Sequence, residues 1–317
     1  MAQTVVRKTA SAEKEQARLP RLRLEVGEDF GKRAALYAAV ALIAFWSLAP
    51  FLWLVVLSFS EIVDIVTKPP RFLPIPLKLI NYQTLFFPQS GLGGYSKIEQ
   101  VGKMPSAFVN SAIVAIGVSL LCLVIGSVAA YAYARYQRYF FHRATFFGLI
   151  MTRMIPGLTL SIPFFIFYKA LGLLDTKLGL IIAYSSFLLP LTIWIMKGYI
   201  EGIPISLERA AMVDGCTRLQ SLFKVILPVC TPGMIAAGIF VFMAAWNEFY
   251  FALILTSTQN AQTMPVVLAG FAVHTGRVTE LPTLFAGSVV GSLPPLILAL
   301  VFQRFIVQGL LVGASKG

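Results

Sequence analysis

Six long apolar stretches, separated by shorter polar segments, run along this chain. The first, from Ala34 to Ser60, contains no charged residue and exceeds the about 20 residues that a helix needs to cross the hydrocarbon core of a bilayer. Five further stretches lie at about 105–134, 144–170, 178–196, 233–256 and 281–302. The pattern predicts an all-α integral membrane protein with six transmembrane helices.

The polar segments predict the rest of the organisation. Residues 1–33 carry charges of both signs and are expected to form an N-terminal tail. Residues 61–105 are polar, with several prolines and glycines, and predict a long irregular loop. A second loop occupies residues 197–232. The transmembrane domain is thus placed at 34–304, and a C-terminal tail follows at 305–317.

Lysine and arginine are unevenly distributed between the two sides that six spans would define. Seventeen of them fall in the two tails, in the turn at 135–143 and in the 197–232 loop, whereas seven fall on the other side. The side that is richer in Lys and Arg is normally cytoplasmic. We therefore predict that both termini and the 197–232 loop are cytoplasmic and that the 61–105 loop is periplasmic.

Composition agrees with a membrane protein and excludes other classes. Hydrophobic residues make up 57% and charged residues 13% of the chain, against about 25% charged residues in a soluble domain. The net charge is +12, but the basic residues lie beside apolar stretches and form no aromatic-interleaved patch, so nucleic acid is not expected as a partner. Cys122, Cys216 and Cys230 have no paired spacing, and neither a disulfide nor a metal site is predicted.

One cytoplasmic segment, residues 206–232, has the pattern of two short helices joined by a turn. Ser206 is a suitable N-cap for the first helix, and Gly215 stands where a helix commonly stops in a left-handed conformation. Thr217 and a glutamine three positions later have the spacing of a capping box, and Pro228 is expected to end the second helix. Such an element, with small residues that expose the backbone, is suited to docking in a groove of another protein.

This segment resembles the EAA loop of binding-protein-dependent ABC importer permeases. The resemblance rests on positions at fixed spacing, which include Glu208, Ala210, Ala211, Val213, Asp214, Gly215, Phe223, Ile226, Leu227, Pro228 and Pro232. In that family the loop is a cytoplasmic coupling helix that inserts into the ATPase subunit. The resemblance thereby assigns ATPase coupling to Glu208, Arg209, Ala210, Ala211, Asp214 and Gly215. The family's glutamate directly before the two alanines is Arg209 here, and Glu208 stands one position earlier.

Three further stretches resemble the carbohydrate branch of this family, in particular the smaller permease subunit of maltose-type importers. They are WNEFYFALILT at 246–256, TMPVVLAGF at 263–271 and QRFIVQGLLVGASKG at 303–317. The resemblance implies a permease in the bacterial inner membrane that moves a sugar or sugar-like solute. It also implies a heterodimer with a second permease, two ATPase subunits and a periplasmic solute-binding protein, all assembled at the lipid bilayer.

Polar and helix-breaking residues inside the apolar stretches are candidates for the substrate pathway. Glu248 is the acidic candidate within a span, and its aromatic and amide neighbours are of the kind that bind sugars by stacking and hydrogen bonding. The candidates are Arg153, Pro156, Trp246, Asn247, Glu248 and Tyr250. Other interpretations stay open, namely pairing between helices for the polar residues, an interfacial position for Arg153 and a tolerated kink for Pro156.

The chain has no Walker A pattern, so ATP hydrolysis is assigned to partner subunits that bind ATP and Mg²⁺. Neither a cofactor nor an enzymatic activity is expected on the chain itself. The alternative function is a self-contained secondary transporter of a small polar solute, in which Glu248 would be the coupling carboxylate. A membrane-embedded enzyme is disfavoured because His142 and His274 are the only histidines and no nucleophile constellation accompanies them.

Overall fold

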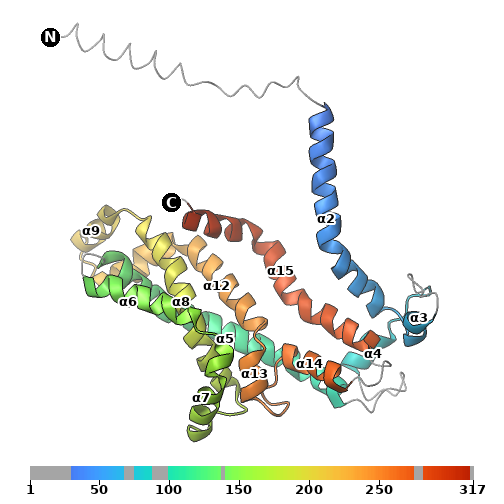
Figure 1. Cartoon of the computed structure of the whole chain (residues 1–317). Coiled ribbons are helices and arrows are strands. Elements are labelled where there is room, and N and C mark those ends of the chain that lie inside the picture. The colour runs from blue at the N-terminus through green and yellow to red at the C-terminus, as the bar shows by residue number, and fades with distance from the viewer. Residues whose placement is uncertain (1–29, 68–74, 88–98, 137–139, 275–280, 315–317) are drawn as a thin grey trace, which may run out of the picture. The chain divides into compact units, whose positions relative to one another are not determined.

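The computed structural model describes residues 30–67, 75–87, 99–136, 140–274 and 281–314, and all regular secondary structure in these ranges is helical (Figure 1). The helices are α2 (Phe30–Ser58), α3 (Ile62–Val66), α4 (Ile80–Phe86), α5 (Glu99–Arg135), α6 (Phe140–Met151), η1 (Thr152–Met154), α7 (Gly157–Ala170), α8 (Lys177–Glu201), α9 (Ile205–Val213), α10 (Arg218–Ser221), η2 (Leu222–Ile226), α11 (Leu227–Val229), α12 (Thr231–Trp246), α13 (Tyr250–Leu255), α14 (Met264–His274) and α15 (Leu281–Ala314).

The chain divides into two compact units, residues 1–52 and 53–317. The first unit contains α2 up to Leu52, and the second contains the helices that follow. Most of the predicted N-terminal tail, residues 1–29, lies outside the described residues. The C-terminal segment predicted as a tail continues α15 as helix to Ala314.

Four helices are long and apolar enough to cross a membrane, namely Gly31–Ser58, Val101–Arg135, Lys177–Glu201 and Leu281–Phe305. Two bent pairs would each add one span. The pair Phe140–Met154 and Gly157–Ala170 is bent by 95°, and the pair Arg218–Val229 and Thr231–Trp246 is bent by 80°. The described residues thus contain four to six candidate spans, which confirms the prediction of an all-α membrane protein.

The third predicted span, 144–170, is not a single helix. Helical structure stops at Met154 and resumes at Gly157 in α7. The cause is local, because the ring of Pro156 disfavours helical backbone at the preceding residue, and Ile155 is extended with φ −77° and ψ 121°. The prediction of one continuous helix was wrong here, since apolar composition does not report a change of direction.

The fifth predicted span, 233–256, is also interrupted. α12 ends at Trp246, and α13 begins after three non-helical residues. Glu248 accepts hydrogen bonds from the backbone N–H groups of Phe251 (3.0 Å) and Ala252 (3.3 Å). Its carboxylate thereby satisfies N–H groups at the start of α13 that have no partner within the helix. Glu248 lies at a break between two helices, and the prediction of one continuous span around it was wrong.

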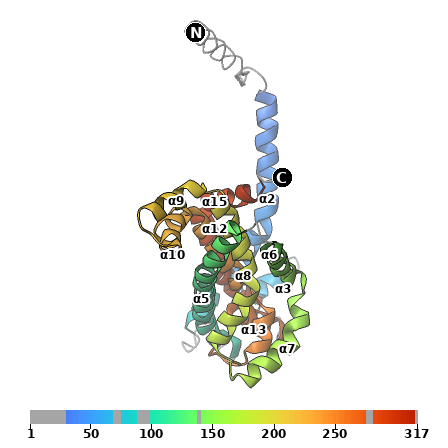
Figure 2. The ribbon, with the colours of Figure 1, turned by 90° about the vertical axis from the view of Figure 1, so that its left-hand side faces the viewer.

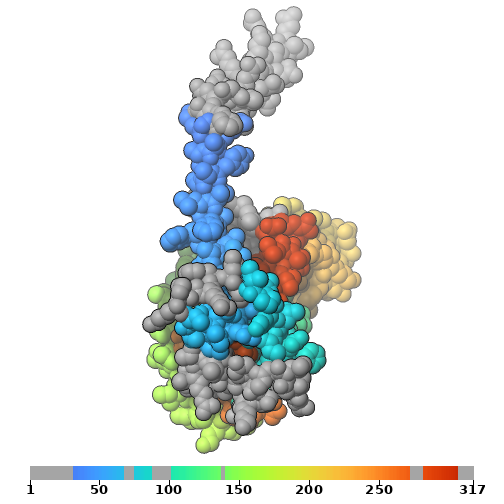
Figure 3. Space-filling model, turned by 90° about the vertical axis from the view of Figure 1, so that its right-hand side faces the viewer, coloured from blue at the N-terminus to red at the C-terminus, as the bar shows by residue number. Residues whose placement is uncertain are grey.

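The predicted irregular loop at 61–105 contains α3, α4 and the first turns of α5, so that prediction was wrong for the part described. The hydroxyl groups of Tyr82 and Ser58 share a hydrogen bond of 2.7 Å, and Asn81 Nδ2 donates to the carbonyls of Ser58 and Ser60 at 2.9 Å each. These bonds hold α4 against the end of α2, and the two segments lie side by side in Figure 3. α4 is too short to be held by apolar packing alone, and the buried side chain of Asn81 adds hydrogen bonds that fix its position.

α5, α8 and α12 form the centre of the second unit, and glycines allow α5 to approach α8 closely. A Cβ atom at Gly126 would lie 2.7 Å from Thr192 Cγ2, and one at Gly117 would lie 2.7 Å from Ile181 Cδ1. α9 and α10 lie at one end of this unit, and α7 and α13 lie at the other (Figure 2). The two groups of residues that the sequence singled out are therefore well separated.

Candidate functional site

The predicted helix-turn-helix is present, and α9 is its first helix. α9 begins two residues earlier than expected, with Pro204 in the N-cap position, and the predicted cap by Ser206 was wrong. Gly215 has φ +89°, the left-handed conformation that its position predicted. The N–H groups of Gly215 and of the next residue bond to the carbonyls of Met212 (3.1 Å) and Ala211 (3.0 Å). These two bonds form a Schellman C-cap, which sets the direction of the turn.

The second helix begins as predicted. The backbone N–H of Gln220 donates to Thr217 Oγ1 (3.2 Å), and the N–H of Thr217 donates to Gln220 Oε1 (2.9 Å), which completes the capping box. Helical structure then runs one residue past Pro228, so the predicted stop was one residue short. A wider π-helical turn, in which the N–H of Leu227 bonds to the carbonyl of Leu222, precedes the proline. The missing N–H of Pro228 disturbs the regular hydrogen-bond ladder at this point.

Glu208 anchors α9 to the end of α5. Its side chain is buried, and Arg135 Nε donates to Glu208 Oε2 at 2.8 Å. The hydroxyl of Tyr131 donates to the other carboxylate oxygen, and the guanidinium of Arg135 also reaches the carbonyl of Ile203 at 3.4 Å. Both carboxylate oxygens therefore have partners inside the chain. Glu208, which the resemblance assigned to coupling, belongs to the inward side of α9.

The outward side of α9 and the helix that follows form an exposed apolar surface with charged edges. We call this the docking face, and it consists of Leu207, Arg209, Ala210, Val213, Asp214, Leu219 and Phe223, which are all exposed. Val213 is 87% exposed, and an exposed apolar patch of this kind with a polar rim is typical of a surface that another protein covers. Of the six predicted coupling residues, Arg209, Ala210 and Asp214 lie on this face and Gly215 forms the adjoining turn, whereas Glu208 and Ala211 face inward.

Trp246, a predicted pathway residue, is used in packing. Its ring is 3% exposed, is stacked with Phe242 at 5.7 Å and meets Phe108 edge-on at 5.4 Å. The indole Nε1 donates to the carbonyl of Gly291 at 2.9 Å. Pro295 lies four residues after Gly291 and has no N–H, so this carbonyl lacks its helical partner. The indole supplies the missing hydrogen bond, and α15 runs uninterrupted through its two prolines.

The other predicted pathway residues lie at two helix breaks, one between η1 and α7 and one between α12 and α13. Asn247 is exposed and its Nδ2 donates to the carbonyl of Met243 at 2.8 Å, and Tyr250 is 54% exposed at the start of α13. Arg153 is exposed in η1, one turn before Pro156, which caps α7. α7 packs against α13. The structure therefore brings Pro156 near the Glu248 break and leaves their polar neighbours open to a partner or to solvent.

Sequence reasoning missed an aromatic cluster between α7, α8 and α13. The rings of Phe187 and Phe251 are stacked with centroids 4.7 Å apart, and Phe164 lies 5.3 Å from Phe251. These residues are spread over almost 90 positions of the chain, and no local pattern connects them. These long-range contacts depend on the break at Pro156, which directs α7 toward α13, and the sequence pattern does not report that change of direction.

Sequence reasoning also missed Asp175, which ties the turn before α8 to the turn after α13. Its carboxylate accepts hydrogen bonds from the N–H groups of Ser257 (2.9 Å) and Thr258 (3.0 Å) and from the Thr258 hydroxyl. Partial burial acts to raise the pKa of Asp175, but these three hydrogen bonds outweigh it and lower the pKa below its usual value. The ionised carboxylate is therefore the form that stabilises this connection.

The geometry defines a helical membrane protein with an exposed helix-turn-helix between two of its candidate spans. Residues 122–312 match the family described as binding-protein-dependent transport system inner membrane component, and the chain belongs to this family. It is 35% identical to the trehalose transport system permease protein SugB of Mycobacterium tuberculosis (strain CDC 1551 / Oshkosh), over 90% of this chain and 100% of that protein.

Other relatives and solved structures agree. The trehalose/maltose transport system permease protein MalG of Thermococcus litoralis is 36% identical over 92% of this chain and 99% of its own length. A bacterial ABC transporter involved in the import of the acidic polysaccharide alginate has a chain of similar fold, with a TM-score of 0.70 at 21% identity, over 87% of this chain and 98% of that chain. Membership of this family favours a permease subunit over the alternative of a self-contained secondary transporter.

Proposed function

We propose that this chain is a permease subunit of an ATP-driven importer for a sugar or sugar-like solute that a periplasmic binding protein delivers. Its relatives include permeases for trehalose and for trehalose and maltose. A similar solved structure is an alginate transporter in complex with a periplasmic protein that holds an alginate pentasaccharide, at a TM-score of 0.58. These names support a carbohydrate as the substrate class.

In the proposed topology, each bent helix pair crosses the bacterial inner membrane once, which gives six spans. Both termini and the 197–232 loop lie in the cytoplasm, and 61–105 is periplasmic. The transmembrane domain extends over 34–304, with tails before and after it. The distribution of Lys and Arg supports this orientation.

Two ATPase subunits and a second permease complete the proposed importer, and the ATPases bind ATP and Mg²⁺. The docking face would sit in a groove of one ATPase, so that closure of the ATPase pair moves α9. The single observation that carries this proposal is the two-sided character of α9, which is fastened to α5 through Glu208 and exposed along Val213. Arg209 stands at the position where the family has a glutamate. In the proposed complex it would make an ion pair with an acidic group of the ATPase.

The test is affinity purification in mild detergent of the wild-type chain and two tryptophan variants. Gly215→Trp is expected to lose the co-purifying ATPase and sugar-stimulated ATP hydrolysis. Gly172→Trp is the matched control, because Gly172 also has positive φ (+67°) and open space around its Cβ position, but lies in the turn after α7. Equal recovery of an ATPase with both variants would refute docking at α9. Solute uptake by the purified chain alone would instead support the alternative hypothesis of a secondary transporter.

A further inference from the structure

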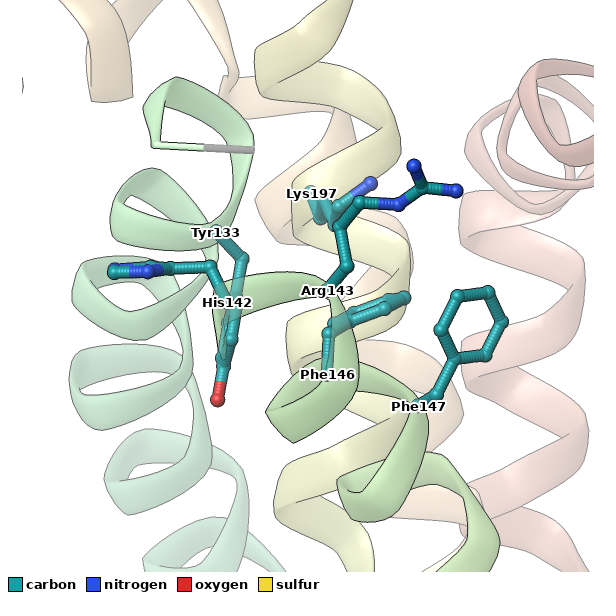
Figure 4. A pocket seen from close by; sticks show the side chains of 6 residues that line it. All are labelled: Tyr133, His142, Arg143, Phe146, Phe147 and Lys197. Carbon is teal, nitrogen blue, oxygen red and sulfur yellow. The ribbon is translucent and has the colours of Figure 1, made fainter. Parts of the chain in front are cut away.

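A pocket separate from the docking face lies between α5, α6 and α8 (Figure 4). Its volume is about 300 Å³, at the lower end of the about 300–1,000 Å³ that is usual for ligand pockets. The lining residues are Tyr133, His142, Arg143, Phe146, Phe147 and Lys197. None of them is acidic, and two of them, Arg143 and Lys197, are basic.

The aromatic residues give the pocket a defined wall. Tyr133 from α5 and Phe146 from α6 have ring centroids 5.4 Å apart, and Lys197 Nζ lies 4.8 Å from the centroid of Phe146. Lys197 also pairs with Glu201, one turn later on α8. Figure 4 shows the side chain of Arg143 extended on the same side as Lys197. Two basic side chains from different helices thus lie on one side of the pocket, and the ring of Phe146 is within cation–π distance of one of them.

The pocket lies where three helices reach one boundary of the membrane domain. Tyr133 is two residues from the end of α5, and Lys197 is in the last turns of α8, close to α9. α6 itself presents apolar side chains outward: Phe140 is 86% exposed, and Phe141 and Phe147 are also exposed. A helix with exposed aromatic residues beside basic ones is typical of the interface between lipid headgroups and acyl chains.

We propose that this pocket binds a phosphate group, carried either by an anionic phospholipid headgroup or by a free phosphate. A guanidinium and an ammonium group together match the charge and geometry of phosphate oxygens. Basic pockets between helices on the cytoplasmic side commonly bind lipid headgroups, and the exposed phenylalanines of α6 would contact the acyl chains. The inference rests on the proposed topology for the side of the membrane, but not on the docking of an ATPase.

The experiment compares lipid binding by the purified chain, with whatever subunits co-purify, by native mass spectrometry. The variants are Arg143→Gln, Lys197→Gln and the matched control Lys169→Gln, an exposed lysine in the last turn of α7. Each is titrated with phosphatidylglycerol, with phosphatidylcholine and with inorganic phosphate, in the absence of nucleotide. Arg143→Gln is the decisive variant, because Lys197→Gln also breaks the ion pair with Glu201.

The wild-type protein and the Lys169→Gln control are expected to prefer phosphatidylglycerol, and each pocket variant is expected to bind it about fivefold more weakly. Phosphatidylglycerol that millimolar inorganic phosphate does not displace identifies the lipid as the ligand. Phosphate that binds the wild type, displaces the lipid and fails to bind Arg143→Gln identifies free phosphate. Two results would overturn the proposal, provided that inorganic phosphate does not bind either. In the first, the wild type binds phosphatidylglycerol and phosphatidylcholine equally. In the second, Arg143→Gln binds phosphatidylglycerol as tightly as the Lys169→Gln control does. The lipid-binding results do not depend on whether an ATPase co-purifies, so the outcome of the Gly215→Trp experiment would not change their interpretation.

Discussion

Replacing Glu208 by glutamine is expected to destabilise the end of the domain that carries α9. Glutamine keeps the shape of the side chain but removes the charge that faces Arg135, whose Nε lies 2.8 Å from the carboxylate with both side chains less than 10% exposed. Removing one partner of a buried ion pair costs about 3–5 kcal/mol, because the other charge is left uncompensated. Domains of 150–250 residues lose about 2–4 °C in thermal midpoint per kcal/mol, so the midpoint should fall by about 6–20 °C.

The assay is thermal unfolding of the purified protein in detergent at a fixed scan rate, because membrane complexes commonly unfold irreversibly. Arg209→Gln, an exposed change on the neighbouring position, is the control and should change stability by less than about 0.5 kcal/mol. Glu208→Gln combined with Arg135→Met removes both charges and should recover much of the loss. Two results would show that Glu208 does not stabilise the contact between α9 and α5. One is a thermal midpoint of Glu208→Gln equal to that of the wild type, and the other is a double variant with the lowest midpoint of all.

Three further outcomes are expected. Gly215→Ala should cost about 1–2 kcal/mol, because residue 215 has φ +89° but open space for a Cβ atom, and thermal unfolding would show whether this strain exists. Trp246→Phe should cost about 1–3 kcal/mol, since it leaves the carbonyl of Gly291 without a donor; a midpoint equal to that of the control Trp194→Phe, which changes an exposed tryptophan, would contradict this. Asp175→Asn should lower the free energy of unfolding at neutral pH, because it removes the ionised carboxylate. In the wild type this contribution is fully present above the usual aspartate pKa and is lost as the pH falls through the lowered pKa of the folded state. The stabilities of the variant and the wild type should therefore converge in acid. Stability profiles of the two proteins that stay parallel down to low pH would refute the last prediction.

Much of the helical content follows from the sequence, because spans such as Val101–Arg135 and Lys177–Glu201 are uncharged except at their ends and long enough to cross a bilayer. The cap chemistry around α9 was equally local. Gly215 and the pair Thr217–Gln220 were identified by residue type and spacing, and their bonds are present. Such features are predictable since each depends on residues within five positions of one another.

The interruptions of the third and fifth spans were not predictable in the same way. A single proline, such as Pro156, breaks one helix, whereas α15 passes through Pro294 and Pro295. In α15 a distant donor, the indole of Trp246, satisfies the carbonyl that Pro295 leaves free. Sequence pattern alone cannot distinguish a rescued proline from one that breaks the helix, because the rescuing group lies 45 positions away.

The burial of Glu208 also depends on a distant partner, and it bears on how α9 could act. A short helix that is exposed on one side would shift freely under load if only apolar contacts held it, since such contacts are not directional. The bonds from Arg135 and Tyr131 are directional, and they join α9 to the last turn of α5. α5 in turn packs closely against α8 along its glycines. A displacement imposed on Val213 would therefore move the ends of two long helices together, whereas with Glu208→Gln the same displacement would be absorbed at the loosened contact. Uptake should accordingly fall more steeply than ATPase recovery in that variant, and equal losses of both would show that Glu208 supports docking alone.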